Sequence, residues 1–149
     1  MDITVLKQYT SLCEERRDIE KRISKTMMQL EEAKSTIVED IVKGSSKHFP
    51  YVSSNMHVAG VDEGLVKRKL KALNRLKGLH EEKKIEIMEK EADVEEFLKS
   101  VDDSWLRQII RYKVIDRLTW TAVGMRMKTN GDACRKQFER YINMSEMSN

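Results

Sequence analysis

Two long stretches of the chain carry apolar residues at the spacing expected of paired helices. Between Ile3 and Lys43 there is neither glycine nor proline, and apolar residues recur at the first and fourth positions of successive heptads. A seam of this kind predicts a long helix that packs lengthwise against a second one. The seam consists of Val5, Tyr9, Leu12, Ile19, Ile23, Leu30, Ala33 and Ile37, with Arg16 and Thr26 as its polar exceptions.

The second stretch extends from Glu63 to about Lys99, and Asp62 is placed to cap its first turn. Because the two stretches have similar lengths and a short connection, they predict an antiparallel helical hairpin, a coiled coil within residues 1–100. The second stretch also has apolar residues outside its seam, so we expect the hairpin to form a homodimer or a higher homo-oligomer. These residues are Leu70, Leu79, Ile85, Met88 and Leu98.

Residues 44–62 interrupt the helical pattern and form the tip of the hairpin. Gly44-Ser45-Ser46 is expected to end the first helix, because glycine readily adopts the left-handed conformation at a helix C-terminus. Phe49-Pro50-Tyr51-Val52 and residues 56–60 indicate two short extended arms around a turn at Ser53-Ser54-Asn55. We therefore expect a small β-hairpin or an ordered loop, whose large side chains either cap the helix pair or bind a partner.

Residues 101–143 have the pattern of a three-helix module, and residues 144–149 that of a frayed polar tail. Asp102, Asp103 or Ser104 is expected to cap the first helix of the module. Two helices alone would have too small a core, so the first helix is expected to give the other two a buried side. That side consists of Trp105, Leu106, Ile109, Ile110 and Val114.

The other two helices of the module are separated by a tight turn. Thr119 and Asn130 are each placed to cap one of them through a side-chain oxygen. Gly124 is a small residue where the two helices would cross closely. Each helix has one apolar face, made by Trp120, Val123 and Met127 in the first and by Cys134, Phe138 and Ile142 in the second.

The outer face of the last helix is polar and mostly basic. An apolar inner face, a tight turn and a basic outer face at this spacing predict a helix-turn-helix that presents its last helix to the major groove of double-stranded DNA. The outer face comprises Asp132, Arg135, Lys136, Glu139 and Arg140.

The order of residues between Leu118 and Ile142 resembles the fourth-region helix-turn-helix of bacterial sigma factors. The pattern is Leu-Thr-Trp-x-x-Val-small-x-x-Met, a tight turn, and Asn-x-x-x-Cys-Arg-x-x-Phe-x-Arg, and the resemblance covers about residues 105–142 without a gap. The first turn residue is usually glycine in this motif, whereas Lys128 stands there, so we expect a wider or a strained turn.

The resemblance to sigma factors implies which residues meet DNA. By position in the motif, Asn130 caps the recognition helix, and the residues expected to face base edges are Asp132, Arg135, Lys136 and Glu139. Those expected to lie against phosphates are Thr119, Thr121, Arg126, Lys128 and Arg140.

The rest of the chain is similar to small phage late-transcription regulators of the ArpU and RinA kind. This similarity rests on the long helices together with Gly44-Ser45-Ser46 and Phe49-Pro50-Tyr51. It implies a sigma-like transcription regulator, encoded by a phage or prophage, that acts on DNA. In such a regulator we expect the helical hairpin either to dimerise or to contact RNA polymerase.

The distribution of charge agrees with a polyanion at the C-terminal module. Residues 1–100 carry 19 basic and 19 acidic side chains, whereas residues 101–149 carry 9 basic and 6 acidic ones. The formal net charge of +3 therefore lies in the module, and DNA would be drawn to it.

Other function classes lack their usual signals. No apolar run approaches the roughly 18 residues of a membrane span, and the sequence shows no secretion signal. Two cysteines far apart in the sequence predict a reducing, cytoplasmic setting. His48, His57 and His80 show no metal-ligand spacing, and no catalytic or phosphate-binding motif occurs. We therefore expect neither an enzyme nor a cofactor or metal.

Three functional readings remain open. The sequence favours a sequence-specific DNA-binding transcription regulator. A phage small terminase-like packaging protein is an alternative, because such proteins also join a helix-turn-helix to oligomerising helices. A structural coiled-coil scaffold whose last helices never meet DNA is the third.

Overall fold

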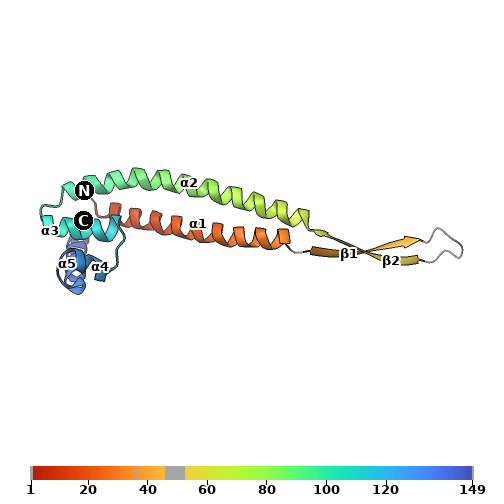
Figure 1. Cartoon of the computed structure of the whole chain (residues 1–149). Helices are drawn as coiled ribbons and strands as arrows, with labels where there is room; N and C mark the ends of the chain where they lie inside the picture. The colour runs from red at the N-terminus through yellow and green to blue at the C-terminus, as the bar shows by residue number, and fades with distance from the viewer. Residues whose placement is uncertain (1, 36, 46–52, 149) are drawn as a thin grey trace. The chain divides into compact units, whose positions relative to one another are not determined.

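A computed structural model of the chain describes residues 2–35, 37–45 and 53–148, with the side chains of residues 2–35 and 60–148. The chain divides into two compact units, Met1–Arg17 with Glu81–Asn149 (unit 1) and Asp18–His80 (unit 2). In chain order the elements are α1 (Thr4–Ser35), β1 (Ile37–Ser45), β2 (Ser53–Val61), α2 (Glu63–Lys99), α3 (Ser104–Ile110), the π-helical η1 (Arg111–Ile115), α4 (Trp120–Arg126) and α5 (Gly131–Met147) (Figure 1).

α1 and α2 pack against each other as an antiparallel hairpin, which confirms the predicted all-α fold class (Figure 1). In unit 1 the pairing buries Tyr9 and Cys13 of α1 in one cluster with Ile87 and Val94 of α2. In unit 2 it buries Ile19, Leu30 and Ala33, which are predicted seam positions of α1, together with Leu73 of α2.

Three polar residues of α2 contact polar side chains of α1. Nζ of Lys69 donates a hydrogen bond of 2.9 Å to Oε1 of Gln29. Nε2 of His80 lies 3.0 Å from Oε1 of Glu20, and in unit 1 Nζ of Lys83 lies 3.0 Å from Glu15. The apolar stems of these lysines cover the seam while their charged ends reach polar groups, which explains why the seam tolerates them.

The first helix is shorter than the sequence analysis predicts. α1 ends at Ser35 rather than at Lys43, and Gly44 lies inside strand β1 instead of capping a helix. β-branched side chains lose rotamer freedom in a helix and favour strands, and the sequence after Ser35 is rich in them. These residues are Thr36, Ile37, Val38, Ile41 and Val42.

A β-hairpin follows α1. Of the two predicted alternatives, a small β-hairpin and an ordered loop, the structure has the β-hairpin. β1 and β2 pair antiparallel, with Ile37 opposite Val61 and Ser45 opposite Ser53. Its first strand therefore lies earlier in the chain than the predicted arm, and residues 53–55 lie in the second strand rather than in a turn. The predicted arm at Phe49-Pro50-Tyr51-Val52 falls in a segment that lies outside the described residues.

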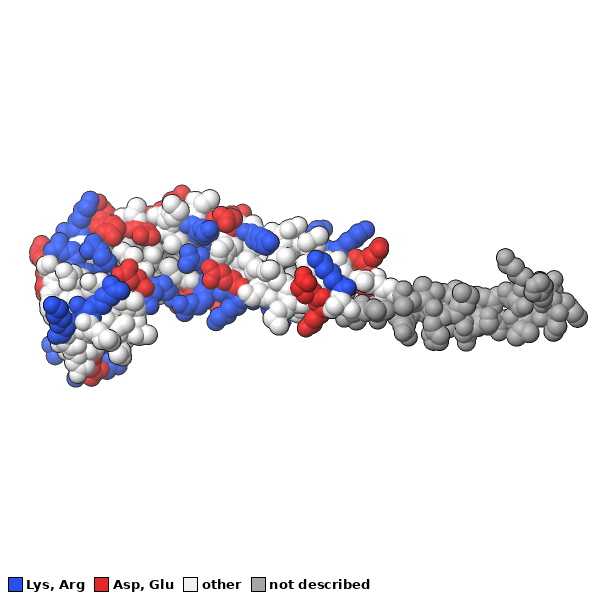
Figure 2. All heavy atoms as spheres, in the orientation of Figure 1, with Lys and Arg blue, Asp and Glu red and all other residues white. Residues whose placement is uncertain are grey.

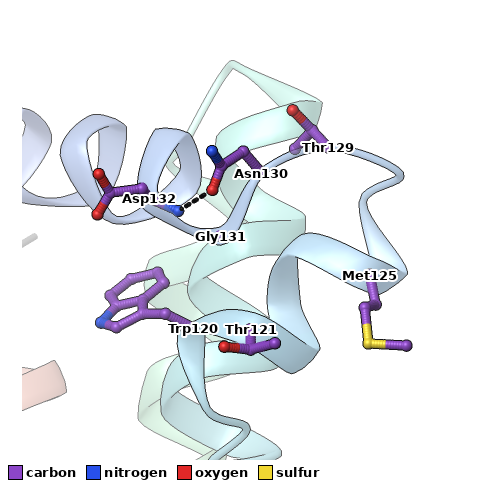
Figure 3. Close-up of a pocket in the computed structure, with 7 residues that line it drawn as sticks. All are labelled: Trp120, Thr121, Met125, Thr129, Asn130, Gly131 and Asp132. Carbon is purple, nitrogen blue, oxygen red and sulfur yellow. Dashed lines mark hydrogen bonds between the residues drawn. The ribbon is translucent and has the colours of Figure 1, made fainter.

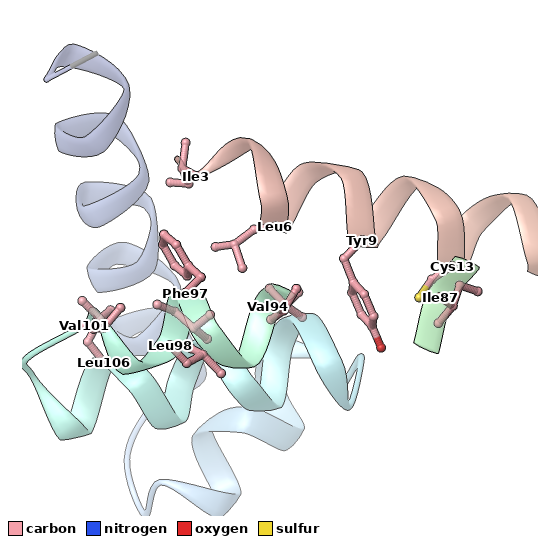
Figure 4. Close-up of a cluster of buried hydrophobic side chains, with 12 residues drawn as sticks. Ile3, Leu6, Tyr9, Cys13, Ile87, Val94, Phe97, Leu98, Val101 and Leu106 are labelled. Carbon is pink, nitrogen blue, oxygen red and sulfur yellow. The ribbon is translucent and has the colours of Figure 1, made fainter. Parts of the chain in front are cut away.

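The helices after α2 share their hydrophobic core with the start of α1 and the end of α2. In unit 1, Ile3 just before α1, Leu6 of α1 and Phe97 of α2 belong to one buried cluster with Leu106 of α3 (Figure 4). Ile110 of α3 belongs to the same cluster. Phe138, Tyr141 and Ile142 of α5 pack against the same cluster. The segment 101–143, which the sequence presents as a module of its own, is thus held on the first turns of α1 and the last turns of α2.

The first helix of the module differs from its prediction in two ways. Asp103 caps α3, its Oδ1 accepting from the backbone N–H of Trp105 at 2.9 Å, but α3 continues as the π-helical η1 instead of one regular helix. Trp105, predicted to be buried, is 43% exposed. It lies in the first turn, at the edge of the apolar face that Leu106, Ile109 and Ile110 form.

The last helix is longer than its prediction. α5 continues to Met147, so the tail that the sequence predicts to be frayed is helical for most of its length. None of the helices within the described residues has the length and the apolar composition that a membrane crossing requires.

The shared core of unit 1 leads to a stability prediction. Leu6 is 3% exposed, and replacing a buried leucine by alanine costs about 2–5 kcal/mol. Leu6→Ala should therefore lower the melting temperature followed by tryptophan fluorescence, because both tryptophans, Trp105 and Trp120, lie after α2. Met28→Ala is the control, since Met28 is 66% exposed and belongs to unit 2. An unchanged fluorescence transition in Leu6→Ala would mean that the C-terminal helices fold without α1.

Candidate nucleic-acid interface

α4 and α5 form a helix-turn-helix with both predicted caps in place. Oγ1 of Thr119 accepts a hydrogen bond of 3.2 Å from the backbone N–H of Ala122 at the start of α4. Oδ1 of Asn130 accepts one of 2.9 Å from the backbone N–H of Asp132 at the start of α5. Each cap satisfies a donor that the first turn of a helix leaves unpaired, so the beginning of each helix is fixed.

The crossing of the two helices depends on two glycines. A Cβ atom on Gly124 would lie 2.4 Å from the backbone nitrogen of Gly131, and one on Gly131 would lie 2.3 Å from the carbonyl oxygen of Trp120. Both distances are far inside van der Waals contact, so α4 approaches the start of α5 backbone to backbone. The close approach at Gly124 is confirmed. That at Gly131 was not predicted, although a glycine directly after the helix cap Asn130 is a signal for it.

The predicted apolar faces pack against α3. Val123, Met127 and Cys134 are buried together with Ile109. The rings of Trp120 and Phe138 meet edge to face, with centroids 5.4 Å apart. Burial raises the pKa of the Cys134 thiol, and both Cys134 and Cys13 are free cysteines.

The turn between α4 and α5 places Lys128 in a left-handed conformation. Its φ is 57°, and the backbone N–H groups of Lys128 and Thr129 donate to the carbonyls of Met125 and Gly124 at 3.3 and 2.9 Å. These two hydrogen bonds close the C-terminal end of α4, and Lys128 is the left-handed residue that follows the helix. Glycine is the residue most often found at such a position. Of the two expected outcomes for the missing glycine, a wider or a strained turn, the structure has the strained one.

All ten residues predicted to contact DNA have exposed side chains. They do not belong to the buried cluster behind them, and several lie along a groove of about 390 Å³ between α4 and the start of α5 (Figure 3). Figure 2 shows Lys and Arg side chains on the outer surface of this part of the chain. The exposed residues are Thr119, Thr121, Arg126, Lys128, Asn130, Asp132, Arg135, Lys136, Glu139 and Arg140.

An ion pair organises the outer face of α5. Nη2 of Arg135 donates a hydrogen bond of 2.8 Å to Oδ1 of Asp132, and Nζ of Lys136 lies 4.0 Å from the other carboxylate oxygen. Asp132 therefore holds the guanidinium of Arg135 along the helix surface. Asp132 is also an acidic residue in the first turn of α5, where the helix dipole favours a negative charge.

Two cations of this region lie over aromatic rings, which the sequence analysis does not foresee. The guanidinium of Arg126 lies 5.6 Å from the centroid of the Tyr112 ring. Nζ of Lys113 lies 4.8 Å from the Trp120 ring and donates to the carbonyl oxygen of Leu118 at 3.2 Å. Contacts of this kind restrict long side chains, so the Tyr112 ring gives Arg126 a fixed place beside the end of α4.

Arg117 ties the turn before α4 to α1. Its φ is 55°, so Arg117 is a second non-glycine residue in the left-handed conformation. Its guanidinium donates to the carboxylate of Glu14 and to the carbonyl oxygen of Thr10, the latter at 3.4 Å. Within unit 1 the start of the helix-turn-helix is thus fixed by α1 as well as by α3.

Searches of protein-family models, of characterised proteins and of solved structures find no match to this chain. The resemblance to sigma factors and phage regulators therefore stays a prediction from the residues. No group of histidine, cysteine and carboxylate side chains among the described residues is arranged to hold a metal ion.

The strained turn gives a prediction about Lys128. A left-handed conformation costs an L-residue about 1–2 kcal/mol, and glycine would remove this strain. Part of the gain in stability is offset, because glycine is more flexible in the unfolded chain. Lys128→Gly should therefore stabilise the protein by about 0.5–1 kcal/mol, measured by urea unfolding. Lys128→Ala is the control, because alanine keeps the Cβ atom and the strain. Equal stabilities of the two variants would show that the turn relaxes in solution.

The helix crossing gives a second prediction. Gly124→Ala should destabilise the protein by about 1–3 kcal/mol or more, because the added methyl group meets backbone atoms that have no room to move. Gly78→Ala is a matched change in α2, where nothing lies within 4 Å of the added Cβ atom. That variant should be more stable by about 0.5–1 kcal/mol, since alanine favours helix over glycine. A tolerated Gly124→Ala would mean that the two helices are not in backbone contact.

Proposed function

We propose that this chain is a sequence-specific DNA-binding transcription regulator that reads double-stranded DNA with α5. The observation that carries the proposal is the combination of two capped helices in backbone contact with a polar, exposed outer face on the second. An α-helix fits the DNA major groove, and a helix-turn-helix places the first turns of its second helix against base edges.

The spacing of the exposed residues on α5 supports base contacts. Asp132, Lys136 and Glu139 follow one another at steps of four and three, so they share one stripe of the helix. Arg135 flanks this stripe and is oriented by Asp132 at 2.8 Å. A bidentate contact of arginine with guanine discriminates against a wrong base by about 1–3 kcal/mol, which makes Arg135 the main candidate for sequence preference.

The residues around this stripe support contacts with phosphates. Arg126, Lys128 and Arg140 are exposed cations, and Thr119 and Thr121 present hydroxyls near the start of α4. Such contacts position a protein on the duplex and carry no sequence information. Their role in the proposal is therefore affinity, and that of the α5 stripe is selectivity.

The finer parts of the proposal rest on the resemblance to phage late-transcription regulators. In this reading the hairpin of α1 and α2 makes a homodimer or a higher oligomer, or contacts RNA polymerase. The exposed Ile85 and Met88 of α2, 58% and 72% exposed, support an association surface in unit 1. A small terminase-like packaging protein is the second candidate, and sedimentation equilibrium separates the two because a dimer favours the regulator and a ring of many copies favours packaging.

The proposal is tested by two substitutions with different expected effects. Arg135→Ala should lose preference for a site selected from random duplexes by the wild-type protein, while it keeps most of its binding to random DNA. Lys128→Ala should weaken both by a similar factor and reduce the slope of log K against log salt by about one unit. Both affinities are measured by fluorescence anisotropy over a series of salt concentrations.

Two results would contradict the proposal. If Arg135→Ala lowers binding to selected and random DNA by equal factors, α5 does not read sequence. If neither variant changes any DNA binding, α4 and α5 form a protein-interaction surface instead.

A further inference from the structure

The two halves of α2 differ sharply in charge. Between Glu63 and His80 the one acidic residue is Glu63, whereas from Glu81 to Lys99 there are eight acidic and four basic residues. The sum over residues 1–100 hides this segregation, because the two halves cancel. The basic residues of the first half are Lys67, Arg68, Lys69, Lys71, Arg75 and Lys77.

Three of these residues form a row on the surface of unit 2. Arg68, Lys71 and Arg75 are spaced by three and four positions, so they lie on one side of α2, and all three are exposed. Arg22 and Lys25 make a similar exposed row on α1. We call these five residues the basic hairpin face.

The pairing of the two helices brings the rows onto neighbouring elements. Gln29 lies one further turn along the side of α1 that carries Arg22 and Lys25, and its Oε1 accepts from Nζ of Lys69, the neighbour of Arg68, at 2.9 Å. His80, at the other end of this segment, lies 3.0 Å from Glu20. The antiparallel register between these two contacts places the α1 row at the same level along the hairpin as the α2 row.

The cations of the basic hairpin face have no acidic partners within the part of the chain that the structure describes. None of the five takes part in an ion pair or a side-chain hydrogen bond there. The second half of α2 is different, because each of its lysines has a carboxylate nearby. For example, Lys90 lies 3.1 Å from Asp93 and Lys99 lies 3.1 Å from Glu96.

An external polyanion would stabilise a row of cations that has no acidic partners. Like charges at a spacing of three or four residues repel one another along a helix, and a bound polyanion removes this repulsion. Over Arg68 to Arg75 the row spans about 10 Å at the helical rise of about 1.5 Å per residue. Adjacent phosphates of one DNA strand are closer together than this, so the row reaches more than one of them.

The composition around this face favours a phosphate backbone over a protein partner. Residues 18–35 and 63–80 contain no phenylalanine, tyrosine or tryptophan. Protein interfaces are enriched in aromatic residues and depleted in lysine, whereas contacts to phosphate are made mainly by lysine and arginine. The chemistry of this face therefore fits a chain of phosphates.

We propose that the basic hairpin face binds the phosphate backbone of double-stranded DNA. The site lies in unit 2 and uses none of the residues assigned to the helix-turn-helix, so it does not rest on the function proposed above. It adds affinity that is independent of sequence and sensitive to salt.

The test uses the full chain and a random-sequence duplex. The variant Arg68→Gln/Lys71→Gln/Arg75→Gln removes three cations of the face while keeping helix propensity nearly unchanged. The slope of log K against log salt should become shallower by about two to three units, since each phosphate contact contributes about 0.9. Far-UV circular dichroism checks that the variant retains its helices.

The control is Lys84→Gln/Lys90→Gln/Lys99→Gln, which removes the same charge from the same helix. These lysines are already paired with carboxylates of α2, so the slope should stay at the wild-type value. Equal slopes in all three proteins would overturn the proposal and favour an acidic protein as the partner of this face. Equal reductions in both variants would also overturn it, because the effect would then be one of net charge.

The same measurements separate this proposal from the function of α5. If Arg135→Ala has no effect on site preference while the basic hairpin face variant shows the expected shallower slope, the helix-turn-helix proposal fails and this one stands. If Arg135→Ala loses its preference while the face variant behaves like the wild type, the reverse holds. A wild-type chain that binds no duplex even at low salt overturns both.

Discussion

The arrangement of unit 1 depends on a hydrophobic core that four helical segments share. Ile3 just before α1, Leu6 from its first turn, Phe97 and Leu98 from the end of α2, and Ile110 from α3 are buried together. A three-helix segment as short as residues 101–143 buries a small fraction of its surface, so it gains stability from neighbours. Because Phe138 and Ile142 of α5 also pack on this core, the proposed recognition helix is fixed to the same base as the hairpin ends.

Within that base, the direction of α5 is set by backbone contacts rather than by long side chains. Gly124 and Gly131 let α4 and the start of α5 touch directly, and Asn130 fixes where α5 begins. Side chains can rotate, whereas two backbones in contact can hardly shift, and base recognition needs side chains held to within a fraction of an ångström. The arrangement suits a surface whose exposed residues must present a constant pattern.

Local signals in the sequence were enough for the features that depend on a few neighbouring residues. The caps at Thr119 and Asn130, the close approach at Gly124 and the apolar faces of α4 and α5 all follow from spacing and residue type. The antiparallel hairpin follows in the same way from two seams and a short connection. The DNA contacts assigned to the exposed face of α5 remain predictions, since exposure is necessary for them and not sufficient.

The features that the sequence analysis missed depend on competition or on long-range packing. The end of α1 at Ser35 was set by β-branched residues that outweighed an unbroken heptad pattern. Trp105 is apolar, but its position in the first turn of α3 leaves it at the edge of the core. The basic hairpin face was hidden because charge was summed over residues 1–100, whereas its effect depends on which charges already have partners.

The two free cysteines report when helices of unit 1 open, through the rates at which they are alkylated. Cys13 belongs to α1 and Cys134 to α5, and both are buried, so an alkylating reagent reaches either sulfur only when its helix opens. Burial also raises the pKa of the Cys134 thiol, which lowers the fraction of reactive thiolate in the closed state. Comparing the labelling times of the two sulfurs shows whether α5 leaves its base alone or together with α1.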